Sequence, residues 1–86
     1  MSAHAIVLIE AERASMFTLG SELIAVAGVV SVYGVTGEWD FVATVEVEQH
    51  DQLRSVVEQI QANTGVARTQ TLVALDVYTE RSGDSE

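Results

Sequence analysis

The sequence predicts an α+β fold in which a single antiparallel sheet carries two helices on one face. The first observation is the order of local patterns, which runs strand, helix, strand, strand, helix, strand along 86 residues. The second is a repeat: Gly28-Val29 and Gly65-Val66 stand 37 residues apart, and each pair closes a helical segment and opens a strand. Two βαβ halves of this kind form the ferredoxin-like arrangement, and right-handed crossovers place both helices on one face of the sheet.

The first half of the chain supplies a strand, a helix and a hairpin. Residues 5–9 are a short β-branched run, which is typical of a buried strand. A helix is predicted over residues 15–27, with Ser15 as its N-cap and Gly28 as the glycine that follows it. Strands are predicted over residues 29–36 and 39–48, joined by a turn at Gly37-Glu38. The helix is expected to bury the apolar positions that recur at helical spacing, Met16, Phe17, Gly20, Leu23, Ile24 and Ala27.

The second half adds one helix and one strand. Asp51 begins the helix, and residues 66–79 form a long last strand. The chain therefore divides into one domain, residues 1–80, and a disordered acidic tail, residues 81–86. The apolar residues of the second helix follow a spacing of three and four, namely Leu53, Val56, Val57 and Ile60.

Composition favours an oligomer. A domain of this size buries little more than about 60% of its unfolded surface, so its core is marginal. Hydrophobic residues nevertheless make up 48% of the chain, and cysteine is absent, so no disulfide can help. Small apolar domains of this kind gain stability by associating. We expect two copies to pair through the sheet face that the helices leave uncovered, whose expected members are Val30, Val32, Val42, Thr44, Leu72 and Ala74.

The charge balance excludes several classes of partner. Thirteen acids face four arginines, lysine is absent, and the formal net charge is −9. Such a surface repels phosphate groups, so we expect no direct nucleic-acid partner and no membrane association. The longest apolar run, residues 5–9, falls far short of the ~20 residues of a spanning helix. Without a basic N-terminal segment or cysteines, the chain is expected to be cytoplasmic.

Motifs for chemistry are lacking. No nucleophile motif or phosphate-binding loop is present, so we predict no enzyme activity, catalytic residue, cofactor or metal. Glu46, Glu48 and His50 share one side of an extended strand and are candidate metal ligands. The preferred interpretation is a solvated strand end that leads into a helix. Arg13 and Arg54 are likewise interpreted as surface charges.

Asp40 is the acid that stands out, because it lies in the hairpin between Trp39 and Phe41. A carboxylate beside apolar surface suits an ammonium group, and turn amides near Gly37 suit a carboxylate, so an α-amino acid would satisfy both. The alternative is that Asp40 caps its own hairpin through a hydrogen bond to the backbone. Trp39 similarly fits either a pocket wall or an interface.

Two segments resemble the signature of the effector-sensing domain of the feast/famine (Lrp/AsnC) transcriptional regulators, the RAM domain. They are Val35-Thr36-Gly37-Glu38-Trp39-Asp40-Phe41-Val42 and Thr64-Gly65-Val66-Ala67-Arg68-Thr69-Gln70-Thr71. The resemblance extends over about residues 5–79 and includes the order of the elements. Trp39 stands where the family more commonly has tyrosine or phenylalanine.

The resemblance implies an effector site and a mode of assembly. In that family the domains pair through their sheets, the dimers form tetramers or larger closed rings, and amino acids bind between neighbouring dimers. The hairpin loop of one copy would form one wall of the site and residues 68–71 of a neighbour another. Asp40 would meet the ligand amine or hold the loop around it. The ligand-binding residues implied in this way are Val35, Thr36, Gly37, Glu38, Trp39, Asp40, Arg68, Thr69, Gln70 and Thr71.

The leading hypothesis is an amino-acid-binding, oligomeric regulatory domain that lacks a helix-turn-helix and does not bind DNA itself. Co-assembly with full-length Lrp/AsnC regulators or with metabolic enzymes belongs to this hypothesis. One alternative is a small dimeric α+β barrel enzyme of the monooxygenase or isomerase type, for which Tyr33 and Tyr78 are the available reactive side chains. Another is a structural interaction module without a ligand. A ligand-dependent change in assembly distinguishes the first hypothesis from the last, and turnover would reveal the enzyme.

Overall fold

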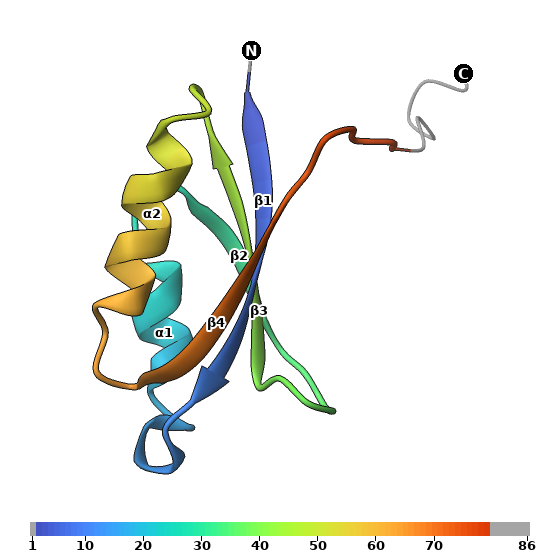
Figure 1. The fold of residues 1–86 in the computed structure, drawn as a ribbon. Coiled ribbons are helices and arrows are strands. Elements are labelled where there is room, and N and C mark those ends of the chain that lie inside the picture. Colours follow the sequence, from blue (N-terminus) through green and yellow to red (C-terminus); the bar gives the residue numbers. More distant parts are fainter. Residues whose placement is uncertain (1, 80–86) are drawn as a thin grey trace.

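The computed structural model describes residues 2–79 and has the predicted architecture (Figure 1). Its elements are β1 (Ala3–Ala11), a 3-10 turn (Arg13–Ser15), α1 (Leu19–Ile24), β2 (Val29–Gly34), β3 (Phe41–Val47), α2 (Gln52–Gln61) and β4 (Val66–Val73). The strands form one antiparallel sheet in the order β2-β3-β1-β4, and both helices cover the same face of it. The predicted ferredoxin-like α+β fold is confirmed.

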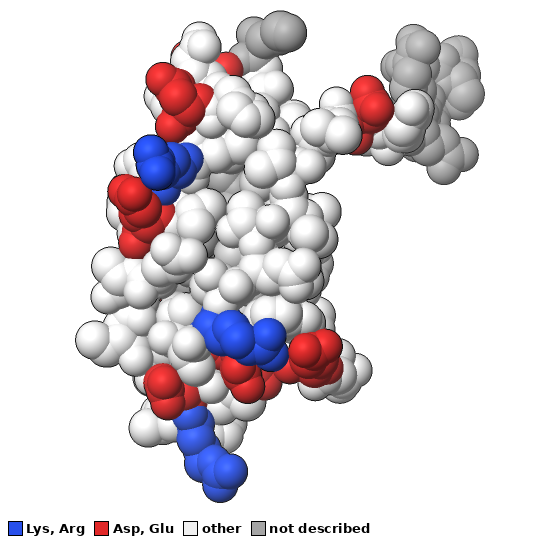
Figure 2. All heavy atoms as spheres, in the orientation of Figure 1, with Lys and Arg blue, Asp and Glu red and all other residues white. Residues whose placement is uncertain are grey.

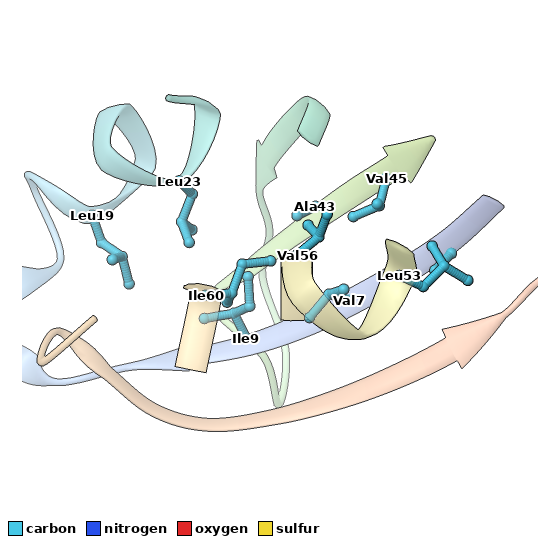
Figure 3. Packing of buried hydrophobic residues seen from close by; sticks show 10 residues of the cluster. Val7, Ile9, Leu19, Leu23, Ala43, Val45, Leu53, Val56 and Ile60 are labelled. Atoms are coloured by element: carbon cyan, nitrogen blue, oxygen red, sulfur yellow. The ribbon is translucent and has the colours of Figure 1, made fainter. Parts of the chain in front are cut away.

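The core lies between the sheet and the two helices, with β1 near its centre (Figure 3). Opposed residues of antiparallel strands share a face, so the pairing of Val7 with Ala43 and of Ala5 with Val45 brings four buried side chains together. The two helices cover these side chains with residues from one stripe each. The buried apolar residues are Ala5, Val7, Ile9, Leu19, Leu23, Ala43, Val45, Leu53, Val56 and Ile60.

The first helix is shorter than predicted. It has six residues and begins at Leu19, whereas the sequence pattern places its start at Ser15. Residues 13–15 form a 3-10 turn instead. The Glu12 N–H donates a hydrogen bond to the Gly65 carbonyl over 2.8 Å, and a Cβ at Gly65 would lie only 2.7 Å from the Ser15 Oγ. Because this stretch is held against the start of β4, it does not follow an α-helical path.

The later start changes which residues α1 buries. Leu19 and Leu23 face the core, and Leu19 lies outside the predicted set. Four residues that were expected to pack are exposed: Met16 by 40%, Ile24 by 46%, Phe17 completely, and Ala27. The prediction for the buried face of this helix is therefore confirmed at Leu23 and at Gly20, where a Cβ would lie 3.4 Å from the Phe41 ring, and it is wrong at the exposed positions.

The other elements differ from prediction mainly at their ends. β4 ends at Val73, although the Ala74 N–H still donates to the His4 carbonyl over 2.9 Å. Asp51 is the N-cap residue of α2, but its side chain makes no capping hydrogen bond. The tail predicted at residues 81–86 lies outside the described residues. Within residues 2–79, neither helix has the length and apolar content needed to cross a membrane.

The sheet face opposite the helices is bare and largely apolar, and it is termed the open face here. Strand pairing places Ile6 between Thr44 and Leu72, and it places Val42 opposite Tyr33. The exposed fraction is 39% for Ile6, 44% for Leu72 and 58% for Tyr33. The predicted presence of Val42, Thr44 and Leu72 on this face is confirmed.

One expected member of the open face lies on the other side of the sheet. Val32 pairs with Ala43 and packs against the buried core. A register shift between Val29 and Ser31 precedes it, and a bulge of this kind changes the alternation of side chains by one position. As a result β2 presents Tyr33 on the open face in place of Val32.

Candidate functional site

The loop between β2 and β3 is fastened at its base to the end of β1. The Val35 N–H donates to the Asp40 carbonyl over 3.0 Å, and the Asp40 N–H donates to the Ile9 carbonyl over 2.9 Å. Thr36 and Gly37 form the exposed tip. Gly37 has a φ of +112°, a left-handed conformation that favours glycine. The loop is thus a closed hairpin with an anchored base.

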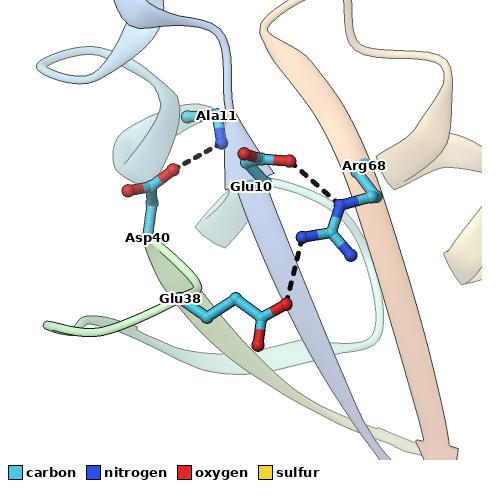
Figure 4. Close-up of polar contacts among 5 residues, drawn as sticks. All are labelled: Glu10, Ala11, Glu38, Asp40 and Arg68. Carbon is cyan, nitrogen blue, oxygen red and sulfur yellow. Dashed lines mark hydrogen bonds and ion pairs between the residues drawn. The ribbon is translucent and has the colours of Figure 1, made fainter.

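The Asp40 carboxylate binds the backbone of β1. Its Oδ2 accepts a hydrogen bond from the Ala11 N–H over 2.8 Å (Figure 4). The two residues are 29 positions apart, so this bond is tertiary and is not the local hairpin cap considered in the sequence analysis. Among residues 2–79 no hydrogen bond reaches Oδ1. One carboxylate oxygen therefore holds the loop in place, and the other is left for a further partner.

Arg68 joins β4 to the hairpin loop. Its Nε donates to the Glu10 Oε1 over 3.0 Å, and its Nη2 lies 3.4 Å from the Glu38 Oε2 (Figure 4). The guanidinium carbon also lies 4.3 Å from the centre of the Trp39 ring, within cation–π range. The hydrogen bond with Glu10 is the largest cause of a raised pKa of Arg68, so this group stays charged at any ordinary pH. The four residues form the Arg68 cluster.

The predicted site residues of β4 are divided between the two faces of the sheet. Arg68 and Gln70 point to the open face, where Arg68 meets the loop of its own chain. Thr69 and Thr71 point toward α2: the Thr69 Oγ1 accepts a hydrogen bond from the Gln61 Nε2 over 3.0 Å, and Thr71 lines a groove beside that helix. Within one chain the four residues therefore do not form a single wall, although the alternation along the strand is as predicted.

An open hollow of about 480 Å³ lies beside the base of the hairpin. Asp40 and Arg13 supply its charged groups, and most of the remaining lining is apolar. The sequence pattern predicts a surface charge at Arg13 and core positions for Met16 and Phe17. The turn after β1 brings these three residues beside Asp40, and no local sequence pattern predicts that position. The complete lining is Arg13, Met16, Phe17, Gly34, Val35, Asp40 and Phe41.

The pairing of charges singles out Arg13. In the described part of the chain it forms no ion pair, whereas the Arg54 Nε lies 3.6 Å from the Glu58 carboxylate and Arg68 is held by two glutamates. Figure 2 shows the charged side chains gathered toward the two ends of the molecule, with a broad uncharged area between them. Residues 2–79 contain no group of three His, Asp or Glu side chains that could hold a metal ion. The hollow is thus lined by the Arg13 guanidinium, which has no ion-pair partner among the described residues, and by the Asp40 carboxylate, of which only Oδ2 accepts a hydrogen bond there.

A family model described as the Lrp/AsnC ligand binding domain matches residues 4–84. The chain belongs to this family, as its two loop and strand motifs suggested. This membership also confirms the prediction that the chain is not an enzyme, because the family supplies ligand-binding domains to transcriptional regulators. The barrel-enzyme alternative is thereby wrong.

Individual relatives agree with this assignment. The HTH-type transcriptional regulator FL11 of Pyrococcus furiosus is 26% identical over 76 residues, which are 88% of this chain and 50% of the regulator. The chain thus spans about half the length of the curated relatives that it matches. TTHA0845 from Thermus thermophilus is 37% identical, with a TM-score of 0.83 over 91% of this chain and 99% of that one. A feast or famine regulatory protein from M. tuberculosis, complexed with L-methionine, is 27% identical, with a TM-score of 0.75 over 92% and 54% of the two chains.

Proposed function

We propose that the chain is an oligomeric effector domain that binds an α-amino acid at the base of the hairpin and makes no contact with DNA itself. The observation that carries this proposal is the presence of Asp40 and Arg13, one carboxylate and one guanidinium, on a single apolar hollow. The methionine complex of the mycobacterial relative supports the same class of ligand. The effector-loaded oligomer would act by co-assembling with full-length Lrp/AsnC regulators or with metabolic enzymes.

The hollow offers a complementary group for each part of an amino acid. The ammonium group would donate to the Asp40 Oδ1 while Oδ2 stays on the Ala11 amide. The ligand carboxylate would pair with Arg13, which has both the charge and the planar donors for this contact. Met16 and Phe17 line the same hollow, so a large apolar side chain should be preferred over a polar one.

The open face supports the proposed association of two copies of the chain. A net charge of −9 makes copies of the chain repel each other, so a stable contact needs a surface whose charges are absent or already paired. The centre of the open face meets this requirement, because it is apolar and Arg68 at one end of it is paired with Glu10. We propose a face-to-face dimer, and further assembly that brings residues 68–71 of a neighbour to the loop.

Thermal-shift screening of the twenty amino acids, followed by calorimetry, tests the ligand proposal. A ligand present at 100 times its Kd stabilises the folded state by about 2.7 kcal/mol, and large apolar amino acids should give the largest shifts. Asp40→Asn keeps an oxygen for the Ala11 amide but removes the charge, so affinity should fall about ten- to a hundredfold. Arg13→Gln should have an effect of similar size on the carboxylate end.

Arg54→Gln is the matched control, because Arg54 lies on α2, pairs with Glu58 and does not line the hollow. It should leave the affinity unchanged. Equal affinities of the unmutated and Asp40→Asn proteins would move the ammonium site elsewhere. If none of the twenty amino acids shifts the melting temperature, the ligand-free interaction module becomes the better account.

A further inference from the structure

Gly34 ends β2 at a position where glycine weakens the strand. Glycine loses more backbone freedom on folding than any other residue and has no side chain to pack. A glycine within a strand therefore often marks a bulge, a tight bend or a place where a ligand or another backbone comes close. The bulge of β2 lies between Val29 and Ser31, whereas the pairing from Ser31 to Gly34 is regular. The bulge thus does not account for Gly34.

Backbone conformation and packing account for other glycines of residues 2–79 but not for Gly34. Gly28 and Gly37 have positive φ values, which Gly34 does not. At Gly65 a Cβ would lie within 2.7 Å of a side chain packed against it. At Gly34 the nearest atom to a Cβ would be the Phe41 Cε1 at 4.0 Å, an ordinary van der Waals distance. Alanine would therefore fit at this position, and the fold does not require glycine there.

The space that Gly34 leaves open belongs to the hollow beside the hairpin. Gly34 stands two positions after Val32, so it faces the same side of the sheet, which is the side of the helices. It pairs there with Phe41, and both residues line the hollow together with Asp40 and Arg13. The missing side chain therefore leaves one edge of the Phe41 ring open to the hollow that also contains the two charged groups.

We infer that Gly34 determines which effectors the hollow accepts, because the side chain of the effector occupies the place of the side chain that residue 34 lacks. Carbon atoms attract most strongly at about 3.5–4.0 Å, so a ligand carbon can take the position beside the Phe41 ring that a Cβ would otherwise fill. Asp40 directly precedes Phe41, so an ammonium group bound to Asp40 leaves the effector's side chain close to this ring. The class selected is a long, branched or aromatic apolar amino acid. The inference rests on the effector site proposed above.

A second protein chain is the alternative occupant of this space. The partner in the face-to-face dimer does not reach it, because Gly34 faces the helices and the proposed dimer contact is on the open face. A copy added by further assembly would approach from outside the dimer. Its backbone would cover Asp40 and Arg13 without a complementary charge for either, whereas an amino acid supplies one for each. The charges of the hollow therefore favour the small ligand.

Gly34→Ala tests the inference by calorimetry with free leucine, methionine, phenylalanine and alanine as effectors. One extra methyl group in a packed site should lower the affinity for the three large amino acids about five- to a hundredfold. Free alanine carries a single methyl group, so its affinity should change by less than about threefold. The melting temperature of the ligand-free variant should rise by about 2–6 °C, because an alanine residue loses less backbone freedom on folding than glycine.

Ala62→Val is the matched control, because it also adds methyl groups but lies exposed at the end of α2, away from the hollow. It should leave all four affinities unchanged. A Gly34→Ala protein that keeps its affinity for the large amino acids, or that loses affinity for free alanine to the same extent, overturns the inference while the effector site stands. A lower melting temperature also overturns it, because the fold would then require glycine, and a smaller assembly in sedimentation would show a protein contact instead. If none of the twenty amino acids binds the unmutated protein, the proposed function and this inference fail together.

Discussion

Replacing Leu72 with Glu should separate the dimer that we propose to form through the open face. Leu72 is 44% exposed in the single chain, and fully burying a leucine contributes about 1.5–3 kcal/mol. Covering its exposed part therefore contributes about 0.7–1.3 kcal/mol per copy, which the variant loses twice in a symmetric dimer. Each carboxylate buried without a partner costs several kcal/mol more. The total exceeds about 4 kcal/mol, which weakens the dimer about a thousandfold or more.

Sedimentation velocity measures this effect directly. The variant should be a folded monomer with an unchanged circular dichroism spectrum, because residue 72 is already 44% exposed in the single chain, where its new carboxylate can reach water. Ile24→Glu is the matched control, since Ile24 is 46% exposed but lies on α1, and it should stay dimeric. A Leu72→Glu protein with the parental sedimentation coefficient and melting temperature would refute the proposed contact. Dissociation by Ile24→Glu would place the interface on the helix side.

Gly28→Ala should lower the free energy of unfolding, measured with urea, by about 2–5 kcal/mol, because the new Cβ would lie 2.7 Å from the Val56 Cγ2 at a φ of +99°. Gly37→Ala has a φ of +112° but open space around it, so it should cost only about 1–2 kcal/mol, and equal losses would contradict the packing argument. Arg68→Ala should alter the fluorescence of Trp39, the chain's single tryptophan, and an identical spectrum would show that the two groups do not stack in solution. Fluorescence anisotropy at physiological salt should detect no binding to duplex DNA above background, given a charge of −9, whereas salt-sensitive micromolar binding would disprove this expectation.

The sequence predicts the fold correctly where one periodicity continues through a whole element. The strict alternation of β3 gives its buried face, and the spacing of Leu53, Val56 and Ile60 gives that of α2. The prediction for the first helix is wrong because apolar residues at helical spacing continue into a stretch whose backbone conformation is set by a distant part of the chain. The contact between Ser15 and Gly65 joins positions far apart in the chain, and no local pattern records it.

For the candidate site, the sequence identifies the groups but not their partners. Asp40 stands out as an acid between aromatic residues, yet it accepts its hydrogen bond from the backbone amide of Ala11. Every residue type except proline has such an amide, so the sequence does not reveal this partner. The contact of Arg68 with its own loop depends on the pairing of β1 with both neighbours. Arg13 resembles an ordinary surface charge until the turn after β1 carries it to the hollow.

The Asp40–Ala11 bond has a consequence for how an effector would be sensed. β1 carries Ala11 at one end and Ile6 in the middle of the open face, so one strand belongs to both the proposed pocket and the proposed dimer contact. An effector that acts on this bond acts on the strand that the partner touches. Thermodynamic linkage then makes the two equilibria reciprocal: if the effector tightens the dimer about tenfold, dimerisation tightens effector binding by the same factor. Apparent effector affinity would then rise with protein concentration, so a cell could set the sensitivity of the domain by how much of it is made.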